Sequence, residues 1–221
     1  MSAAIEFETP RLRLRQWRES DREPFAALNA DPAVMEFFPA LITREASNAS
    51  IDSWQSQFAE RGWSNWAIEV RETKAFVGFA GLSVPRRVFP FSPCVEIGWR
   101  LARAHWGKGF ATEAARGAVR VGFERLALLE IVSFTTVLNL RSRAVMERIG
   151  MHNAHEDFEH QAFRWAIRSV CTACIACNGS DGAPVMPNPS IERTSTGEPH
   201  LALISFWAKC GPPVPAAHVK R

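Results

Sequence analysis

A short glycine-bearing run between an expected strand and an expected helix constrains the fold of this chain more than any other feature. Residues 106–114 read Trp-Gly-Lys-Gly-Phe-Ala-Thr-Glu-Ala. Glycine lets the backbone approach a ligand closely, and the unpaired N–H groups and dipole of a helix N-terminus attract anions. The spacing fits neither Gly-x-x-x-x-Gly-Lys-Ser/Thr nor Gly-x-Gly-x-x-Gly. The run therefore predicts an anion site suited to a pyrophosphate, with a turn that only reverses the chain as the alternative.

Hydrophobic periodicity places this run within a mixed sheet. Alternation with a period of two, as at Leu12 and Leu14, predicts strands with one buried face, and apolar residues at steps of three and four predict helices. The expected strands span residues 9–17, 66–70, 75–84, 94–101 and 131–137, and the expected helices span residues 21–29, 43–61, 112–128 and 139–149. This order predicts an α+β fold with at least one right-handed crossover.

Length and composition bound the class of protein. The 221 residues suffice for one domain with an appendage, and 47% hydrophobic with 22% charged residues can bury a core. No run of about 18 uncharged apolar residues occurs, which argues against a membrane span. The first 15 residues contain Glu6, Glu8 and several arginines in place of an apolar signal segment. We therefore expect a cytoplasmic protein that does not bind membranes.

A change in composition near residue 160 predicts a domain boundary. Residues 1–160 hold 20 Lys+Arg and 20 Asp+Glu, whereas residues 161–221 hold 6 and 3. The neutral body predicts no nucleic-acid binding, and the basic tail is the alternative that would bind nucleic acid with a steep salt dependence. We expect a domain over residues 1–160 and an atypical extension over residues 161–221. The extension has a possible substitute strand near residues 163–171 and is otherwise expected to be largely disordered.

The extension also holds four of the five cysteines. Cys171, Cys174 and Cys177 follow one another at steps of three, and Cys210 comes later. A structural metal site needs a fourth ligand, and nothing in the sequence positions one. We therefore expect no metal and interpret these residues as reduced thiols.

Four motifs give the chain a resemblance to a known family. Residues 106–111 resemble the acyl-CoA pyrophosphate loop of the GNAT superfamily of N-acyltransferases, whose pattern is Gln/Arg-x-x-Gly-x-Gly/Ala. Trp106 in the first position is typical of the branch that resembles the ribosomal-protein N-terminal acetyltransferases. That branch also carries Thr-x-Arg-Leu-x-Leu-Arg, Glu-Ile-Gly-Trp, and Asn-x-x-Ser before Ile-Gly-Met, which residues 9–15, 96–99 and 139–151 match. The resemblance covers the body of the chain and not residues 161–221.

The resemblance implies a fold and an activity. The fold is a mixed, mostly antiparallel sheet flanked by helices, with a parallel strand pair that splays apart at an acyl-CoA cleft. The activity is transfer of an acetyl group from acetyl-CoA to a primary amine, by direct attack in a ternary complex, with a protein N-terminus or a small molecule as the acceptor. The alternative is a non-catalytic acyl-CoA-binding protein whose altered C-terminus no longer forms the acceptor site. We expect a monomer or a homodimer.

The resemblance also implies site residues. Those on the acyl-CoA side lie along the expected cleft: Trp99, Leu101, Gly107, Lys108, Gly109, Phe110, Ala111, Thr112 and Asn139. The backbone of the first two would bind the pantetheine arm, and the amides from Gly107 to Thr112 would bind the pyrophosphate. For catalysis, Glu96 is expected to accept a proton from the amine, with a pKa raised in a partly buried cleft. Ser142 is expected to protonate the departing thiolate, because the chain has no tyrosine.

Several of these roles have plainer alternatives. Glu96 can be an ordinary strand glutamate, and Asn139 an ordinary helix cap. His105 and Glu36 are weaker candidates for the base. The side chains of Lys108 and Arg103 can contact a phosphate or remain solvated, Glu113 suits the electrostatics of a helix start, and Cys94 suits a buried small side chain. Five aromatic residues belong to the core or to the acceptor pocket: Trp17, Phe37, Phe38, Trp54 and Trp63.

Overall fold

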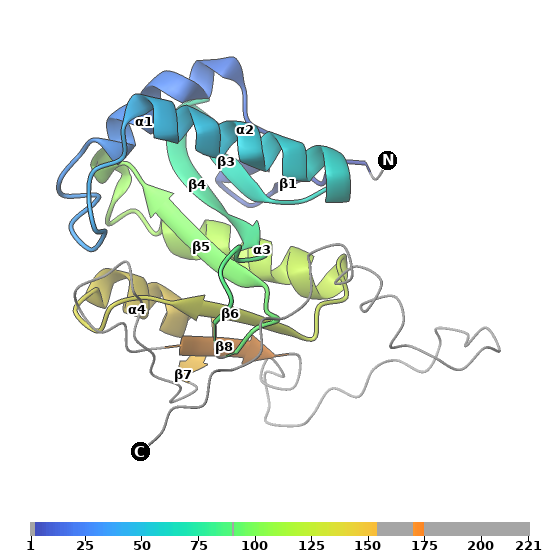
Figure 1. Ribbon diagram of the computed structural model, residues 1–221. Helices are drawn as coiled ribbons and strands as arrows, with labels where there is room; N and C mark the ends of the chain where they lie inside the picture. The colour runs from blue at the N-terminus through green and yellow to red at the C-terminus, as the bar shows by residue number, and fades with distance from the viewer. Residues whose placement is uncertain (1–2, 90, 154–169, 175–221) are drawn as a thin grey trace. The chain divides into compact units, whose positions relative to one another are not determined.

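The computed structural model describes residues 3–89, 91–153 and 170–174 (Figure 1). The chain divides into Met1–Val185 and Met186–Arg221, and every described residue belongs to the first part. The strands are β1 (Phe7–Glu8), β2 (Leu12–Arg15), β3 (Asn65–Val70), β4 (Phe76–Ser83), β5 (Glu96–Leu101), β6 (Glu130–Phe134), β7 (His152–Asn153) and β8 (Val170–Cys174). The α-helices are α1 (Arg22–Asn29), α2 (Arg44–Arg61), α3 (Phe110–Glu124) and α4 (Leu140–Arg148), with 3₁₀ turns at Glu19–Asp21 and Arg103–His105.

The strands form one mixed sheet in the order β1-β2-β3-β4-β5-β6-β8-β7. Among the described strands, β5 and β6 make the one parallel pair, and every other pair of neighbours is antiparallel. The parallel pair requires a crossover, which α3 supplies between β5 and β6. This arrangement confirms the mixed, mostly antiparallel sheet expected from the sequence.

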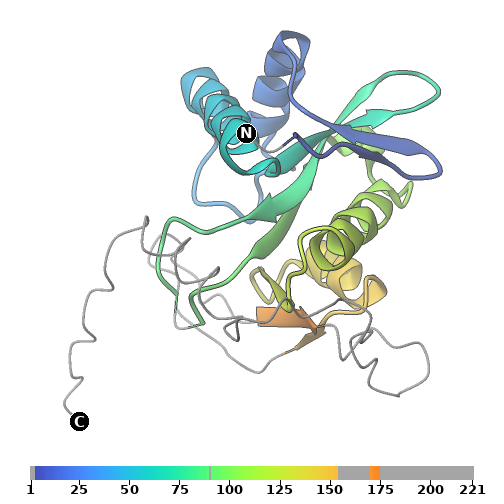
Figure 2. The ribbon, with the colours of Figure 1, turned by 90° about the vertical axis from the view of Figure 1, so that its right-hand side faces the viewer.

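Helices cover both faces of the sheet. Figure 2 shows α1 and α2 on one side of the strands and α3 and α4 on the other. The core between these layers is apolar, and its largest fully enclosed side chains include Trp66, Phe25, Phe58 and Ile97. Burial of such side chains is the main driving force that holds the helices on the sheet.

Local signals explain where the helices begin and end. Thr43 accepts a hydrogen bond from the Ala46 amide at 3.2 Å and caps α2, and Gly62 ends that helix with a left-handed φ of 84°. The helix expected from residue 112 begins at Phe110 instead, because Gly109 at φ 77° is its N-cap. The strand expected over 131–137 ends at Phe134, ahead of the turn that leads to the N-cap Asn139.

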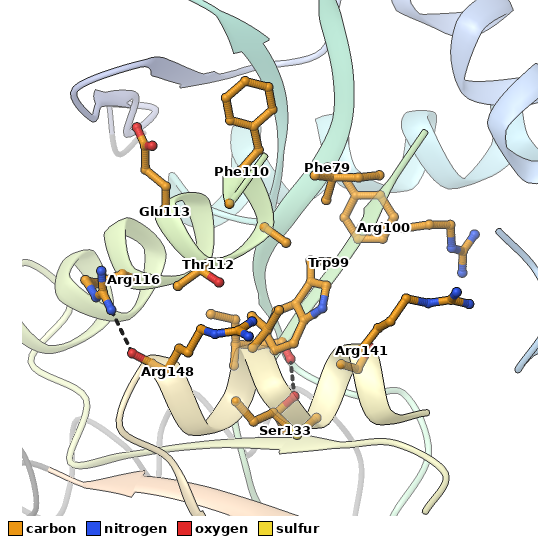
Figure 3. A pocket seen from close by; sticks show the side chains of 18 of the residues that line it. Phe79, Trp99, Arg100, Phe110, Thr112, Glu113, Arg116, Ser133, Arg141 and Arg148 are labelled. Carbon is orange, nitrogen blue, oxygen red and sulfur yellow. Dashed lines mark hydrogen bonds between the residues drawn. The ribbon is translucent and has the colours of Figure 1, made fainter. Parts of the chain in front are cut away.

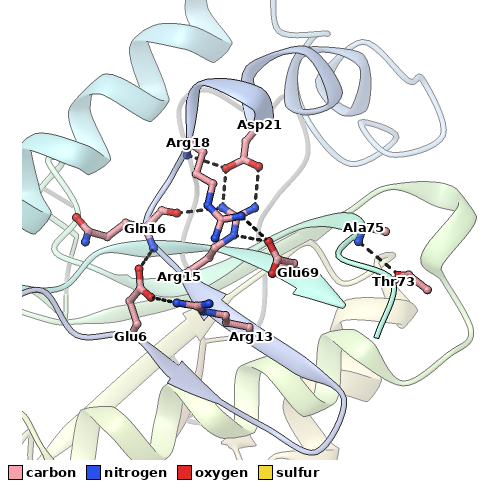
Figure 4. Close-up of polar contacts among 9 residues, drawn as sticks. All are labelled: Glu6, Arg13, Arg15, Gln16, Arg18, Asp21, Glu69, Thr73 and Ala75. Atoms are coloured by element: carbon pink, nitrogen blue, oxygen red, sulfur yellow. Dashed lines mark hydrogen bonds and ion pairs between the residues drawn. The ribbon is translucent and has the colours of Figure 1, made fainter. Parts of the chain in front are cut away.

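Both faces of β2 are partly buried. Arg15, which alternates with Leu12 and Leu14, is buried, with 3% of its side chain exposed. Its guanidinium donates to both carboxylate oxygens of Asp21 at 2.7 and 2.9 Å and to Glu69 at 2.8 Å (Figure 4). Although burial opposes it, hydrogen bonding and the nearby charges of Arg15 and Arg18 lower the pKa of Glu69. Paired carboxylates thus offset the cost of burying this cation.

The expected extension lies almost wholly outside the described residues. The structure describes β8 (Val170–Cys174), which pairs antiparallel with β6 and β7. It overlaps the substitute strand expected near residues 163–171 at residues 170–171 alone, and residues 163–169 lie outside the described residues, so that strand stays a prediction. Cys177 and Cys210 are outside the described residues, and the boundary near residue 160 stays a prediction. Within the described ranges, no group of three or more His, Cys, Asp or Glu side chains is arranged to hold a metal ion. No helix in those ranges is long and apolar enough to cross a bilayer.

Candidate active site

A cavity of about 1680 Å³ opens where β5, β6, α3 and α4 meet. The lining comes from the glycine-bearing loop before α3 and the first turn of α3, from β5, and from the start of α4. Phe37 and Phe38 of the α1–α2 loop line it as well. Figure 3 shows labelled residues of β5, β6, α3 and α4 around this cavity. Of the expected site residues, all line this cavity except Lys108.

The glycine run at the cavity mouth leaves its amides unpaired. Gly107 and Gly109 have φ angles of 73° and 77°, a left-handed conformation that other residues adopt only with strain. Within the described part of the chain, none of the six backbone N–H groups from Gly107 to Thr112 donates to a protein acceptor, and no side chain caps α3. These donors and the helix dipole therefore form a ready site for an anion.

The loop is held in place by an ion pair from the N-terminal strands. Glu113, in the first turn of α3, accepts hydrogen bonds from the Thr9 hydroxyl at 2.6 Å and from the Arg11 amide at 2.8 Å. The Arg11 guanidinium binds Glu113 at 2.7 Å and donates to the carbonyl of Lys108 at 3.0 Å. Although burial opposes it, these hydrogen bonds lower the pKa of Glu113. Glu113 was expected to act through helix electrostatics alone, and the role of Arg11 was missed.

The parallel strands separate next to the loop. Their register has one matched pair, Glu96 with Val132, and the Ser133 hydroxyl donates to the Ile97 carbonyl at 2.9 Å. The Ala102 amide donates to β4 at 2.9 Å. Because successive backbone groups of a strand point to opposite edges, the N–H groups of Trp99 and Leu101 point away from β4, toward the widening gap. The backbone of β5 thus presents a free edge to the cavity.

The expected base, Glu96, lies on β5 inside this cavity. Its side chain makes no ion pair and no hydrogen bond among the described residues, and burial raises its pKa to about 7. A carboxyl group with such a pKa can exchange a proton near neutral pH. Among the described residues Glu96 has no arginine partner, and its role as the base stays a prediction.

Ser142 and Asn139 lie at the start of α4. The Asn139 side chain accepts a hydrogen bond from the Ser142 amide at 3.1 Å, and its amide nitrogen donates to the Thr135 hydroxyl at 3.1 Å. Asn139 is therefore a helix cap that also lines the cavity. The Ser142 side chain lines the same space one turn into the helix.

The weaker candidates differ in position. Glu36 forms an exposed ion pair with Arg141 at 2.6 Å, which occupies its carboxylate. His105 lines the cavity, and burial together with Lys108 lowers its pKa. The side chain of Lys108 is exposed, and Arg103 does not line the cavity. Cys94 is buried, which raises the pKa of its thiol to about 11 and suits a packing role.

The aromatic residues divide between core and cavity. Trp17 and Trp63 are buried in the core, and Trp54 packs against it. Phe37 and Phe38 line the cavity, each beneath an arginine: Arg141 lies 5.9 Å from the ring centre of Phe37, and Arg100 lies 4.1 Å from that of Phe38. Sequence reasoning missed both arginines, since neither stands in a motif with a charge-bearing role.

Unsatisfied polar atoms gather around this cavity. Among the described residues, the buried side-chain atoms without a hydrogen-bond partner are Arg100 Nε, His105 Nδ1, Thr136 Oγ1 and Asn48 Oδ1. The first three belong to residues that line the cavity. Buried polar groups are normally satisfied, and unpaired ones point to a missing polar partner. The site therefore fits a polar ligand.

Comparison with known proteins defines the class. A family model described as "Acetyltransferase (GNAT) domain" matches residues 11–152. "Uncharacterized protein YkkB" of Bacillus subtilis is 33% identical over 153 residues, which cover 69% of this chain and 88% of that protein. "FsC-acetyl coenzyme A-N(2)-transacetylase" of Aspergillus fumigatus is 33% identical over 158 residues, which cover 68% of this chain and 66% of that protein.

A solved structure agrees at the level of the fold. The GNAT-family acetyltransferase from Bacillus anthracis superposes with a TM-score of 0.64 at 23% identity, covering 77% of this chain and 98% of that one. The chain belongs to the GNAT acetyltransferase family. It is, more particularly, a GNAT-type N-acetyltransferase, as its resemblance to that family implied.

Proposed function

We propose that this protein transfers an acetyl group from acetyl-CoA to a primary amine by direct attack in a ternary complex. The observation that carries the proposal is the set of six unpaired amides from Gly107 to Thr112, in a cavity that the half-buried Glu96 also lines. This arrangement supports a site that brings an anionic donor and a proton acceptor together.

The donor half of the site fits coenzyme A. The diphosphate would accept hydrogen bonds from the amides of residues 107–112, where the dipole of α3 adds positive potential. The pantetheine arm would extend along the free edge of β5 at Trp99 and Leu101, replacing the strand partner that β6 does not supply there. Asn139 and Thr136, whose hydroxyl has no hydrogen-bond partner among the described residues, also line the cavity.

The chemistry requires two proton movements. The amine nitrogen attacks the thioester carbonyl carbon, a C–N bond forms, and the C–S bond breaks. Glu96 takes the proton that the nitrogen loses, and Ser142 gives a proton to the sulfur, so that coenzyme A leaves as the thiol. Both groups return to their resting state by exchange with solvent. No covalent acyl-enzyme is needed, which agrees with the buried position of Cys94.

The acceptor is proposed as a primary amine of a protein N-terminus or of a small molecule. One relative carries the name of an acetyl coenzyme A transacetylase, which supports acetyl as the acyl group. Phe37 and Phe38 from the α1–α2 loop also line the cavity, which supports an acceptor site beside that loop.

Calorimetric titration with coenzyme A, followed by thiol-release assays with acetyl-CoA and a panel of amines, tests this function. We expect saturable binding and thiol release with at least one amine class. Binding without release from any amine would instead favour the non-catalytic acyl-CoA-binding protein. Absence of binding would contradict the donor site itself.

A further inference from the structure

One face of β5 carries three residues that point toward the α1–α2 side of the sheet. Glu96, Gly98 and Arg100 alternate with the core residues of this strand and therefore share a face. A Cβ added at Gly98 would meet nothing within 4 Å. Open space over bare backbone thus separates a carboxyl group from a guanidinium group. We call these three residues the acceptor strip.

Arg100 is held on this strip without a counter-charge. Its Nη1 donates to Asn29 Oδ1 at 2.6 Å, and its guanidinium lies 4.1 Å from the ring centre of Phe38 and 5.7 Å from that of Phe79. Its Nε is buried and has no partner, and it makes no ion pair among the described residues. Burial lowers its pKa to about 10, a direction that reports an uncompensated cation.

The same chain contains a satisfied arginine for comparison. Arg15 is enclosed by two carboxylates that use its Nε, Nη1 and Nη2 atoms. Among the described residues, Arg100 contacts no carboxylate: its neighbours are the neutral amide oxygen of Asn29 and the rings of Phe38 and Phe79. A guanidinium group with free donors in a cavity is a ready site for a planar anion.

The neighbouring charges do not satisfy Arg100. Arg141 extends to the same side of the site in Figure 3 and is another cation. The α1–α2 loop holds two acidic residues: Glu36 is paired with Arg141 at 2.6 Å, and the Asp31 carboxylate accepts a hydrogen bond from the Ala33 amide at 2.8 Å. Glu96 lies four residues away on the strand, which is roughly 13 Å between Cα atoms. The described groups around Arg100 therefore leave room for an anion supplied by a ligand.

We propose that the acceptor is an amine that also carries an anionic oxygen group, and that Arg100 binds this group while the amine lies at the Glu96 end of the acceptor strip. The inference rests on the proposed transfer function and narrows its substrate class to amino acids and related amine–oxyacid compounds. It predicts discrimination against polyamines, which would bring further cations to Arg100 and Arg141. A site built to pair with a charged group rejects analogues that lack it.

Wild-type protein alone provides the first test. Thiol release would be measured with ω-amino acids of increasing length, with alkylamines of matched length that lack the carboxylate, with aminoalkylphosphonates, and with spermidine. We expect kcat/KM to be at least tenfold higher for the best amino acid than for its matched alkylamine. Comparison of the amino acids with the aminoalkylphosphonates identifies whether a carboxylate or a phosphonate is preferred. An equal or higher kcat/KM for the alkylamine or for spermidine would overturn the inference and leave the transfer function standing.

Variants identify the residue. Arg100→Gln should abolish the preference for the charged acceptor while the KM for acetyl-CoA stays within about twofold, and Arg100→Lys should keep part of the preference. Arg125→Gln, which changes an exposed arginine outside the cavity, is the matched control and should retain it. The assignment would be overturned if Arg100→Gln kept the preference for the charged acceptor. It would also be overturned if the variant raised the KM for acetyl-CoA as much as the KM for the acceptor.

A binding measurement covers the case in which no amine of the panel is acetylated. Thermal shifts of the protein saturated with coenzyme A would be compared for N-acetylated amino acids and for the corresponding amides. Stronger stabilisation by the carboxylates, lost in Arg100→Gln, supports the anion site even without turnover. Equal shifts overturn it. Absence of any response to coenzyme A contradicts the proposed function separately.

Discussion

At the scale of single residues, the charged side chains of this protein fall into two kinds of environment. Arg15 and Glu69 are buried and paired with one another. Glu96 and Arg100 line the cavity and have no ionic partner in the part of the chain that the structure describes. The Arg15–Glu69 pair stabilises the fold, whereas Glu96 and Arg100 are available to interact with a ligand.

Glu96 predicts a pH profile. Its carboxyl group, with a pKa of about 7, must be ionised to accept a proton, so kcat/KM should rise with pH through about 7. Glu96→Gln should lower kcat by about 10²- to 10⁴-fold and remove this limb, with unchanged affinity for coenzyme A. Rate measurements from pH 5 to 9 check both, and a variant that keeps the wild-type profile would exclude Glu96 as the base.

The same residue predicts a stability difference that does not depend on activity. The pKa of Glu96 is about 7 in the folded protein and 4.5 as its ordinary value, so the folded state binds this proton more tightly than the unfolded state. The protein should therefore lose stability as the pH rises from 4.5 to about 7. Melting temperatures of Glu96→Gln should therefore improve relative to the wild type across that interval. A difference that does not change with pH would show that burial leaves the pKa of Glu96 unshifted.

Arg15 predicts a large loss of stability. Arg15→Ala removes the buried cation between Asp21 and Glu69, which, among the described residues, leaves Asp21 without an ion-pair partner and Glu69 with Arg18 alone. It should cost about 3–5 kcal/mol of unfolding free energy in urea titrations. Arg13→Ala removes a more exposed pair with Glu6 and should cost about 0–1 kcal/mol. Similar costs for the two variants would contradict the assignment of a buried network.

At the scale of elements, the start of α3 combines two features. Left-handed glycines shape the turn, and the Arg11–Glu113 pair fastens it to the N-terminal strands. The glycine spacing was visible in the sequence because it is local. The ion pair was not, since its partners lie 102 residues apart and neither residue type is unusual at its position.

Gly109 predicts a loss of binding. Gly109→Val forces a β-branched residue into a φ of 77° and places a side chain at the cavity mouth, so the affinity for coenzyme A should fall at least about 100-fold. Gly62→Val imposes similar strain at the end of α2, outside the cavity. Each variant should cost about 1–3 kcal/mol of stability, with affinity retained in Gly62→Val alone. Calorimetry that shows equal affinities would contradict the role of this turn.

At the scale of the whole molecule, the sequence predicted the order of the helices and of the strands from β2 to β6, and the position of the glycine turn before α3. These signals depend on periodicity and on residues close in the chain, as at Leu12, Leu14 and Gly109. The burial of Arg15 and the unpaired state of Arg100 depend on which distant elements pack together, as with Asn29 and Phe38 around Arg100. No local pattern distinguishes these two arginines, so tertiary contacts alone reveal that one is satisfied and the other is not.

The central claim is that the amides of residues 107–112 hold the diphosphate of coenzyme A. Residue-resolved amide hydrogen exchange tests this claim most directly. It would be measured on the free protein, on the protein with coenzyme A, and on the protein with pantetheine. These six amides have no protein acceptor, so they should exchange rapidly in the free protein, become protected with coenzyme A, and stay unprotected with pantetheine, which lacks the diphosphate. Unchanged exchange at these positions in protein saturated with coenzyme A would contradict the account.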